Sequence, residues 1–188
     1  TDRTISMTIL DHVDATPAER SAYLKRSAAE RRALGDDVEE VSLTNEDIGE
    51  EAVLSDTRYN EMGKHEQFVL TMTEFGYGKR SSSYDFRLTG RGGKGIRATD
   101  VSKTAEIGPL IAAFPVDDTD QIMMVSDGGQ LIRVPVAGIR IASRATKGVT
   151  VFNTAEGEKV VSVERISEPE GEDEADSVVD PSPGDAQE

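Results

Sequence analysis

The central part of the chain, residues 67–166, alternates short runs of β-branched and other apolar residues with turns that contain glycine. The turns recur at intervals of roughly eight to twelve residues, which is typical of all-β folds. This pattern predicts strands over Phe68–Thr73, Lys79–Asp85, Gly95–Asp100, Leu110–Pro115, Gln121–Ser126, Leu131–Pro135, Gly148–Asn153 and Val160–Arg165.

The segment before it, residues 11–66, has a polar, helical pattern. Thr16, Pro17 and Glu19 form a helix start, since Thr16 can cap, proline suits the first helical position, and Glu19 can accept a hydrogen bond from the Thr16 amide. Apolar residues then recur at helical spacing up to Gly35, which can end the helix.

A second, shorter helix is expected from Ser55 to about Glu66, because Ser55 can cap it. Between the helices, residues 36–51 are acidic with few large apolar side chains, which predicts a loose loop. Residues 169–188 combine prolines with a run of acids, and we expect this tail to be disordered.

The central region repeats itself after a shift of 53 residues, which is the sequence signature of a repeat architecture. Two units follow from this shift, each about 50 residues long. The paired positions are Val69 and Ile122, Thr73 and Ser126, Glu74 and Asp127, Gly76 and Gly129, Arg80 and Arg133, Arg91 and Arg144, Lys94 and Lys147, Gly95 and Gly148, and Ile96 and Val149.

Units of four strands and about 50 residues predict the blades of a β-propeller, in which stacking against neighbours supplies the core. We expect an all-β, partial propeller of two four-stranded blades with a helical insert. A β-sandwich made from a duplicated hairpin pair is the alternative. The predicted divisions are a last strand of a preceding blade (1–10), the acidic helical insert (11–66), a blade (67–117), a final blade (118–168) and the tail (169–188).

The net charge of −15 argues against nucleic acid at first sight, but the charge is unevenly distributed. Residues 11–66 contain 15 acids and 7 bases, and residues 167–188 contain 9 acids and no base. Residues 67–166 contain 11 acids and 13 bases. The repeat region is therefore mildly basic, while the acid lies in the insert and the tail.

Other functional classes are disfavoured by composition. The chain has no Cys, which excludes disulfides and thiolate metal sites, and neither His12 nor His65 lies in a metal-ligand motif. No apolar run is long enough for a membrane span, and no signal-peptide pattern opens the chain, so we expect a cytoplasmic protein. The absence of an initial Met leads us to expect a chain cut from a longer protein. No catalytic constellation is apparent.

The strongest local motif is the turn 91–95, Arg-Gly-Gly-Lys-Gly, whose repeat counterpart is 144–148, Arg-Ala-Thr-Lys-Gly. Each turn offers two cations three residues apart, and glycines let the backbone approach a ligand. Arg and Lys suit phosphate oxygens, and phosphate contacts position a duplex without reading its sequence. The candidate DNA-binding residues are Lys79, Arg80, Arg91, Gly92, Gly93, Lys94, Gly95, Arg133, Arg144, Lys147 and Gly148.

Other interpretations of the first turn are weaker. Residues 90–95 match the dinucleotide fingerprint G-x-G-x-x-G, but a strand-like run follows where that fingerprint needs a helix. A phosphate-binding P-loop is excluded because Gly95, not Ser or Thr, follows Lys94. A solvated turn with stray charges is the remaining alternative, and the second copy of the Arg and Lys argues against it.

The motifs resemble the C-terminal domain of the bacterial DNA gyrase A protein. The resemblance covers residues 67–188, and more weakly 1–10. The insert resembles one found between late blades in some proteobacterial members. The supporting segments are Phe75–Arg80 (FGYGKR), Thr89–Gly95 (TGRGGKG), Asp117–Met124 (DDTDQIMM) and Thr154–Val161 (TAEGEKVV) with the acidic tail.

This resemblance implies a β-pinwheel, a six-bladed propeller variant whose neighbouring blades exchange strands and whose basic rim wraps DNA with positive handedness. It implies double-stranded DNA, the rest of the gyrase A protein, and the gyrase B protein in an A₂B₂ heterotetramer as partners. ATP and Mg²⁺ would serve the whole enzyme, and this chain would hold no cofactor. The family's DNA-cleaving tyrosine lies in another domain. Thr89-Gly90 replaces the Gln-Arg of the family's first-blade motif, so the turn resembles a later blade's partial copy.

Two other functions are alternatives. One is a protein-interaction propeller without nucleic acid, and the other is the equivalent domain of the A protein of topoisomerase IV. The acidic tail could also fold back on the basic rim and compete with DNA.

Overall fold

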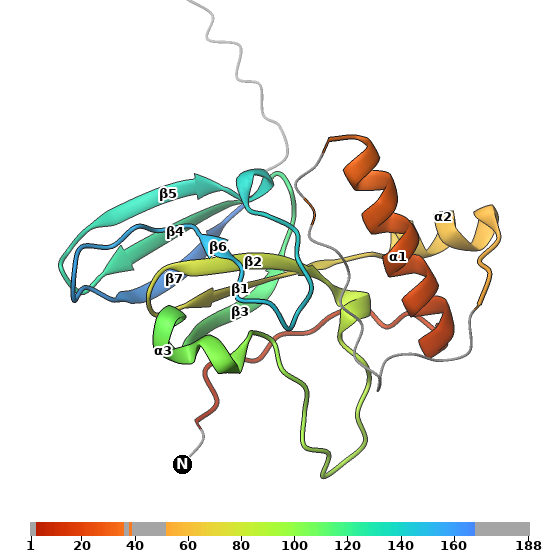
Figure 1. The fold of residues 1–188 in the computed structure, drawn as a ribbon, viewed down its shortest axis with the longest axis horizontal. Helices are drawn as coiled ribbons and strands as arrows, with labels where there is room; N and C mark the ends of the chain where they lie inside the picture. Colours follow the sequence, from red (N-terminus) through yellow and green to blue (C-terminus); the bar gives the residue numbers. More distant parts are fainter. Residues whose placement is uncertain (1–2, 36–37, 39–51, 168–188) are drawn as a thin grey trace, which may run out of the picture.

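The computed structural model describes residues 3–35, 38 and 52–167, and it contains two antiparallel sheets in this part of the chain (Figure 1). The first sheet has the strand order β3-β1-β2-β6, with β1 at Phe68–Thr73, β2 at Tyr77–Ser82, β3 at Leu110–Val116 and β6 at Val149–Thr150. The second has the order β5-β4-β7, with β4 at Gln121–Ser126, β5 at Leu131–Pro135 and β7 at Val160–Ile166. Neither sheet is closed, and the all-β propeller-type fold is as predicted.

The two sheets are joined by an exchanged strand. By sequence β6 belongs to the second repeat unit, yet it pairs with β2 of the first, through Tyr77 with Thr150 and Gly78 with Val149. The first sheet therefore gains a fourth strand from the second unit. The second sheet has three strands in the described residues, where the prediction had four.

Most predicted strands are present, but the third predicted strand of each unit is wrong. The segment Gly148–Asn153 is reduced to the two residues of β6, and Gly95–Asp100 forms no strand at all. A strand needs a neighbour to hydrogen-bond with, and residues 95–100 meet no sheet edge in the described chain. Residues 3–10 also form no strand. Near β3, the Ser6 hydroxyl donates a hydrogen bond to the Ala113 carbonyl (2.8 Å).

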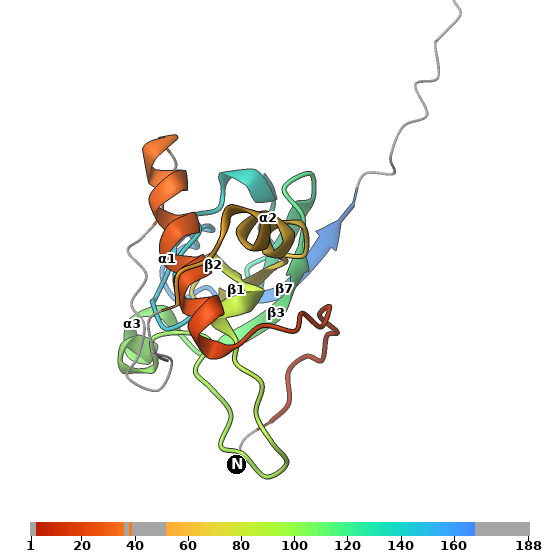
Figure 2. The same cartoon turned by 90° about the vertical axis from the view of Figure 1, so that its right-hand side faces the viewer.

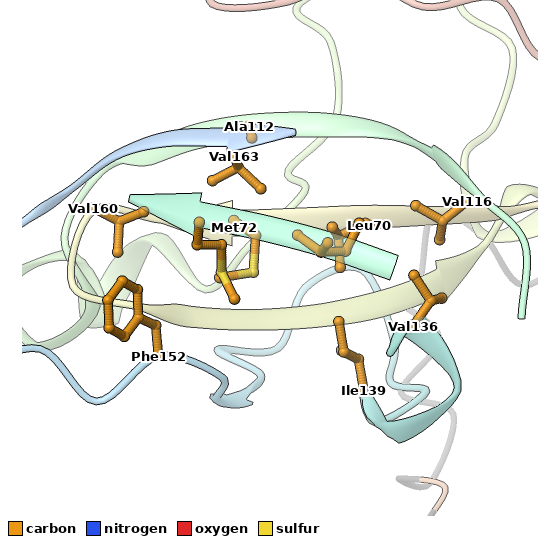
Figure 3. Packing of buried hydrophobic residues seen from close by; sticks show 11 residues of the cluster. Leu70, Met72, Ala112, Val116, Val136, Ile139, Phe152, Val160 and Val163 are labelled. Carbon is orange, nitrogen blue, oxygen red and sulfur yellow. The ribbon is translucent and has the colours of Figure 1, made fainter. Parts of the chain in front are cut away.

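The main core lies between the two sheets and includes side chains of residues 139–152, the exchanged segment that contains β6 (Figure 3). Leu70 and Met72 of β1 are fully buried, and Ile139 and Phe152, at either end of the exchanged segment, pack into the same cluster. Burying side chains of this size contributes roughly 1.5–3 kcal/mol each. The exchange is thus held by apolar packing as well as by backbone pairing.

The insert forms the predicted helices, α1 (Pro17–Ala33) and α2 (Asp56–Lys64), beside the first sheet (Figures 1 and 2). The capping box is present: the Glu19 amide donates to the Thr16 hydroxyl (3.2 Å) and the Thr16 amide to the Glu19 carboxylate (2.8 Å). Tyr23 and Leu24 of α1 pack with Met62 of α2. Apart from Val38, the predicted loop 36–51 lies outside the described residues, as does the predicted tail.

Short helical turns connect the strands. They are η1 (Ser83–Asp85), η2 (Val101–Lys103), α3 (Thr104–Ile107) and η3 (Val136–Gly138). The turn η1 matters most for the site, because Tyr84 packs against the helical insert while Asp85 faces the exchanged segment.

Candidate nucleic-acid interface

Lys79 lies on β2 with only 1% of its surface exposed. Its ammonium donates a hydrogen bond to the Arg144 carbonyl (2.7 Å) and another to the Thr146 carbonyl. Both acceptors belong to the segment that leads into β6. Lys79 therefore holds the exchanged segment, and its prediction as a phosphate ligand is wrong for this arrangement of the chain.

Arg80 follows on β2 and is also buried, with 6% exposed. Its Nε donates to the Ile139 carbonyl (2.7 Å) and a terminal nitrogen donates to the Asp118 carboxylate. The side chain thus closes the junction between the first sheet and η3. Like Lys79, Arg80 was predicted to contact DNA and instead contacts the protein itself.

Arg144 is buried against Asp85 of η1, with 6% of the arginine exposed. Its amide donates to the Asp85 carboxylate (2.6 Å), its Nε donates to the Asp85 carbonyl (2.8 Å), and Nε lies 3.6 Å from the second carboxylate oxygen. The Ser143 hydroxyl also donates to this carboxylate (3.1 Å). Arg144 is therefore an anchor between the units, and its assignment to DNA is corrected.

Gly148, the last predicted residue of the second turn, has a positive φ of 79°. A Cβ at this position would overlap the Gly78 carbonyl, so only glycine allows β6 to approach β2 closely. Gly148 was expected to let the backbone come close to a phosphate. In the structure it lies close to the backbone of the neighbouring strand β2.

Asp85 is a partner of Arg144 that the sequence pattern does not indicate. It is 59 residues away from Arg144 along the chain, and the predicted strand Lys79–Asp85 placed it as an ordinary strand end. A buried arginine requires a carboxylate or carbonyl partner, but only the folded chain shows which one is near. The repeat offers one partial indication. The position equivalent to Asp85 in the second unit is Gly138, so the carboxylate is specific to the first unit.

The first turn, 91–95, is exposed and lies in the loop that projects below the sheets in Figures 1 and 2. Arg91 and Lys94 have no hydrogen-bond or ion-pair partner in the described part of the chain. Gly92 and Gly95 both have positive φ, 73° and 71°, and the Gly93 amide donates to the Gly90 carbonyl (3.2 Å), which forms a turn. Gly92 and Gly95 therefore adopt the left-handed backbone conformation that glycine allows, and their contact with a ligand stays a prediction.

Lys147 keeps 43% of its side chain exposed although its backbone belongs to the exchanged segment. Its ammonium donates to the Glu106 carboxylate (2.6 Å) and lies 5.5 Å from the centre of the Tyr77 ring. This hydrogen bond is the main cause that raises the pKa of Lys147 and lowers the pKa of Glu106. Lys147 is thus a surface cation held over an aromatic ring.

Arg133 is exposed on β5, the edge strand of the second sheet. The eleven predicted residues therefore separate into two groups. Lys79, Arg80, Arg144 and Gly148 join the repeat units, whereas Arg91–Gly95, Arg133 and Lys147 present charge or backbone to solvent. For the second group, contact with DNA stays a prediction.

Both repeat units match the model of a known family, the DNA gyrase C-terminal domain, β-propeller, over residues 67–117 and 120–167. The chain belongs to this gyrase family. The DNA gyrase A protein of Granulibacter bethesdensis is 40% identical over 193 residues, which cover 97% of this chain and 20% of that protein. The gyrase A protein of Escherichia coli strain K12 is 41% identical over 58% of this chain and 12% of its own length.

A solved gyrase A C-terminal domain has the same fold as this chain, with a TM-score of 0.50 and 24% identity, over 54% of this chain and 34% of that one. The chain spans about a fifth of the length of its gyrase A relative from Granulibacter bethesdensis. Within the described residues, no helix is long and apolar enough to cross a membrane, and no cluster of His, Cys, Asp or Glu could hold a metal ion.

Proposed function

We propose that this chain is a DNA-binding and DNA-wrapping part of a gyrase A protein, and that it contributes to ATP-dependent negative supercoiling by a type II topoisomerase. The observation that supports this most is the family match, which covers both repeat units separately. The relatives of the same family that the chain matches are gyrase A proteins. The remainder of gyrase A, the gyrase B protein in an A₂B₂ assembly, and ATP with Mg²⁺ belong to this proposal for the whole enzyme.

The proposed DNA contacts are electrostatic and independent of sequence. Lys94 and Lys147 occupy equivalent positions in the two units, and both are exposed, as is Arg133. An ammonium on a flexible stem binds phosphate as a point charge, and a guanidinium binds it as a fork. Contacts of this kind hold the duplex backbone without distinguishing bases.

The overall charge of −15 is compatible with this proposal because it is segregated. Exposed charges more than about 8 Å apart are largely screened at physiological salt, so a duplex responds mainly to the cations nearest to it. The basic repeat units can therefore attract DNA although the insert and tail are acidic.

Binding of unrelated duplex sequences over a range of salt concentrations tests the proposal. The complete gyrase A protein should bind all of them with similar affinity, and the logarithm of the affinity should fall linearly with the logarithm of the salt concentration. If a protein with Lys94, Lys147 and Arg133 changed to Gln bound DNA as the wild type does, the proposed contacts would be wrong. If the complete protein bound no DNA at low salt, a protein-interaction propeller would be the better interpretation.

A further inference from the structure

Lys147 of the second unit is paired with a carboxylate of the first unit. The lysine lies in the exchanged segment, and Glu106 lies in α3, shortly before β3 of the first unit. The Lys147 ammonium is 2.6 Å from one oxygen of the Glu106 carboxylate, and the Lys103 ammonium is 3.8 Å from the other oxygen. One carboxylate thus lies between two ammonium groups, one from each repeat unit.

This cluster is too exposed to hold the exchanged segment in place. The side chains of Lys103, Glu106 and Lys147 are 53%, 41% and 43% exposed. Exposed ion pairs contribute little to stability, because water and salt screen the two charges. The segment is already held by the buried Lys79 and Arg144. A role in stability therefore does not account for the pair.

The carboxylate of Glu106 belongs to a short sequence that recurs in the second unit. Thr104-Ala105-Glu106 is repeated 50 residues later as Thr154-Ala155-Glu156, and each glutamate lies four residues before a strand, β3 or β7. Glu156 is exposed and has no hydrogen-bond or ion-pair partner in the part of the chain that the structure describes. The recurrence argues against a stray surface charge, and it makes the glutamate a feature of the repeat, as the lysine is.

The chemistry of the pair is that of a phosphate contact. A carboxylate and a phosphodiester both offer a lysine a negatively charged oxygen at hydrogen-bond distance. Glu106 therefore occupies the place that a phosphate oxygen would take on Lys147. The Tyr77 ring, whose centre is 5.5 Å from the ammonium, can still support Lys147 when the carboxylate moves away.

We propose that Glu106 is a phosphate surrogate built into the DNA-binding surface, and that a phosphate of the duplex displaces it from Lys147. Displacement also frees Lys103, which becomes a further phosphate contact that the sequence pattern does not indicate. The competing carboxylate weakens the grip of this part of the surface on DNA. The inference rests on the proposed function, because it needs DNA as the ligand.

The DNA affinity of the complete gyrase A protein carrying Glu106→Gln tests the proposal. Affinity should increase on the order of three- to tenfold at low salt, because DNA no longer has to break the ion pair or approach a carboxylate. The gain should shrink as the salt concentration rises, since salt screens exposed charges.

Glu61→Gln is the matched control. Glu61 is an exposed carboxylate of α2 that is paired with Arg58 (3.0 Å), so the substitution makes the same change in charge and also breaks a surface ion pair. Figure 1 shows α2 and α3 at opposite ends of the first sheet. Glu61→Gln should therefore leave DNA affinity unchanged.

A double-mutant cycle shows whether Glu106 acts through Lys147. In a protein that already carries Lys147→Gln, the further change Glu106→Gln should raise affinity by no more than about twofold, because the main ammonium that the carboxylate holds is gone. In the Glu106→Gln protein, Lys103→Gln should decrease the slope of log affinity against log salt by about one.

The outcomes separate this inference from the proposed function. Equal affinities of the wild type and Glu106→Gln, an equal gain from Glu61→Gln, or the same gain with and without Lys147 would each overturn the surrogate role and leave the proposed function intact. An unchanged slope in the variant with Lys103→Gln would overturn the contact by Lys103. A complete protein that binds no DNA at low salt would overturn the proposed function, and this inference with it.

Discussion

Burial decides what each cation of the repeat does. Lys79 and Arg144 have the same charge as Lys94 and Arg91, but the first two are inside the protein and bonded to carbonyls and a carboxylate. A buried charge without such partners is strongly destabilising, so these residues cannot turn outward to a phosphate without a large cost. The charge pattern alone does not distinguish the two situations.

Asp85→Ala tests the anchor at Arg144. The substitution leaves a buried guanidinium without its carboxylate, so we expect the free energy of unfolding to fall by about 3–5 kcal/mol in urea titrations. Glu106→Ala is the matched control, because it removes the carboxylate partner of the exposed Lys147 and should leave stability nearly unchanged. Equal effects of the two substitutions would contradict an anchoring role.

Gly148→Ala and Gly95→Ala form a second pair. Both glycines have positive φ, so alanine costs about 1–2 kcal/mol at either position. Only Gly148 lies against the Gly78 backbone, and overlap there should add about 1–3 kcal/mol. Thermal unfolding of the 188-residue chain should therefore show a clearly larger loss for Gly148→Ala. A larger loss for Gly95→Ala would contradict the close contact between Gly148 and the Gly78 backbone.

Among the helices and strands, the sequence predicted those whose formation depends on residues close together in the chain. The capping box of α1 and the strands Phe68–Thr73, Gln121–Ser126 and Leu131–Pro135 are where the sequence places them. The third predicted strand of each unit, Gly95–Asp100 and Gly148–Asn153, was not predictable in this way. Its pairing partner belongs to another unit, and periodicity within a unit carries no information about which sheet receives a strand.

The helical insert has its own small core, which predicts a response to alkaline pH. Tyr84 donates its hydroxyl proton to the Met62 carbonyl (2.7 Å), and burial is the main cause that raises its pKa to about 12, with Glu66 adding to the effect. Burial, again with Glu66, also raises the pKa of Tyr23. Both tyrosines are therefore held in the neutral form within the folded insert.

A raised pKa stabilises the fold below the tyrosine's ordinary value near 10, and this contribution is lost as the pH rises toward 12. We expect the stability of the insert to fall between these values, measured by circular dichroism of the helices. Tyr84→Phe should make the fall smaller, because this side chain can no longer ionise. A pH profile that Tyr84→Phe leaves unchanged would contradict the assignment to Tyr84.

For the whole molecule, the repeat was the most informative property of the sequence. It predicted stacked blades, and the two sheets packed across one core confirm the fold class. It also predicted equivalent roles for equivalent residues, but Arg144 is buried in the described chain and Arg91 is exposed. Only one of the two has a neighbouring unit within the described chain, so the same side chain is buried in one copy and exposed in the other.

The proposed phosphate contacts are tested by the salt dependence of DNA affinity in the complete gyrase A protein with Lys94, Lys147 and Arg133 all changed to Gln. Each phosphate contact contributes about one unit to the slope of log affinity against log salt, so the slope should decrease by roughly three. A control with Lys25, Arg32 and Lys64 of the helical insert changed to Gln makes the same change in net charge and should retain the wild-type slope. A wild-type slope in the first variant, or equal decreases in both, would contradict specific phosphate contacts by the exposed cations of the repeat.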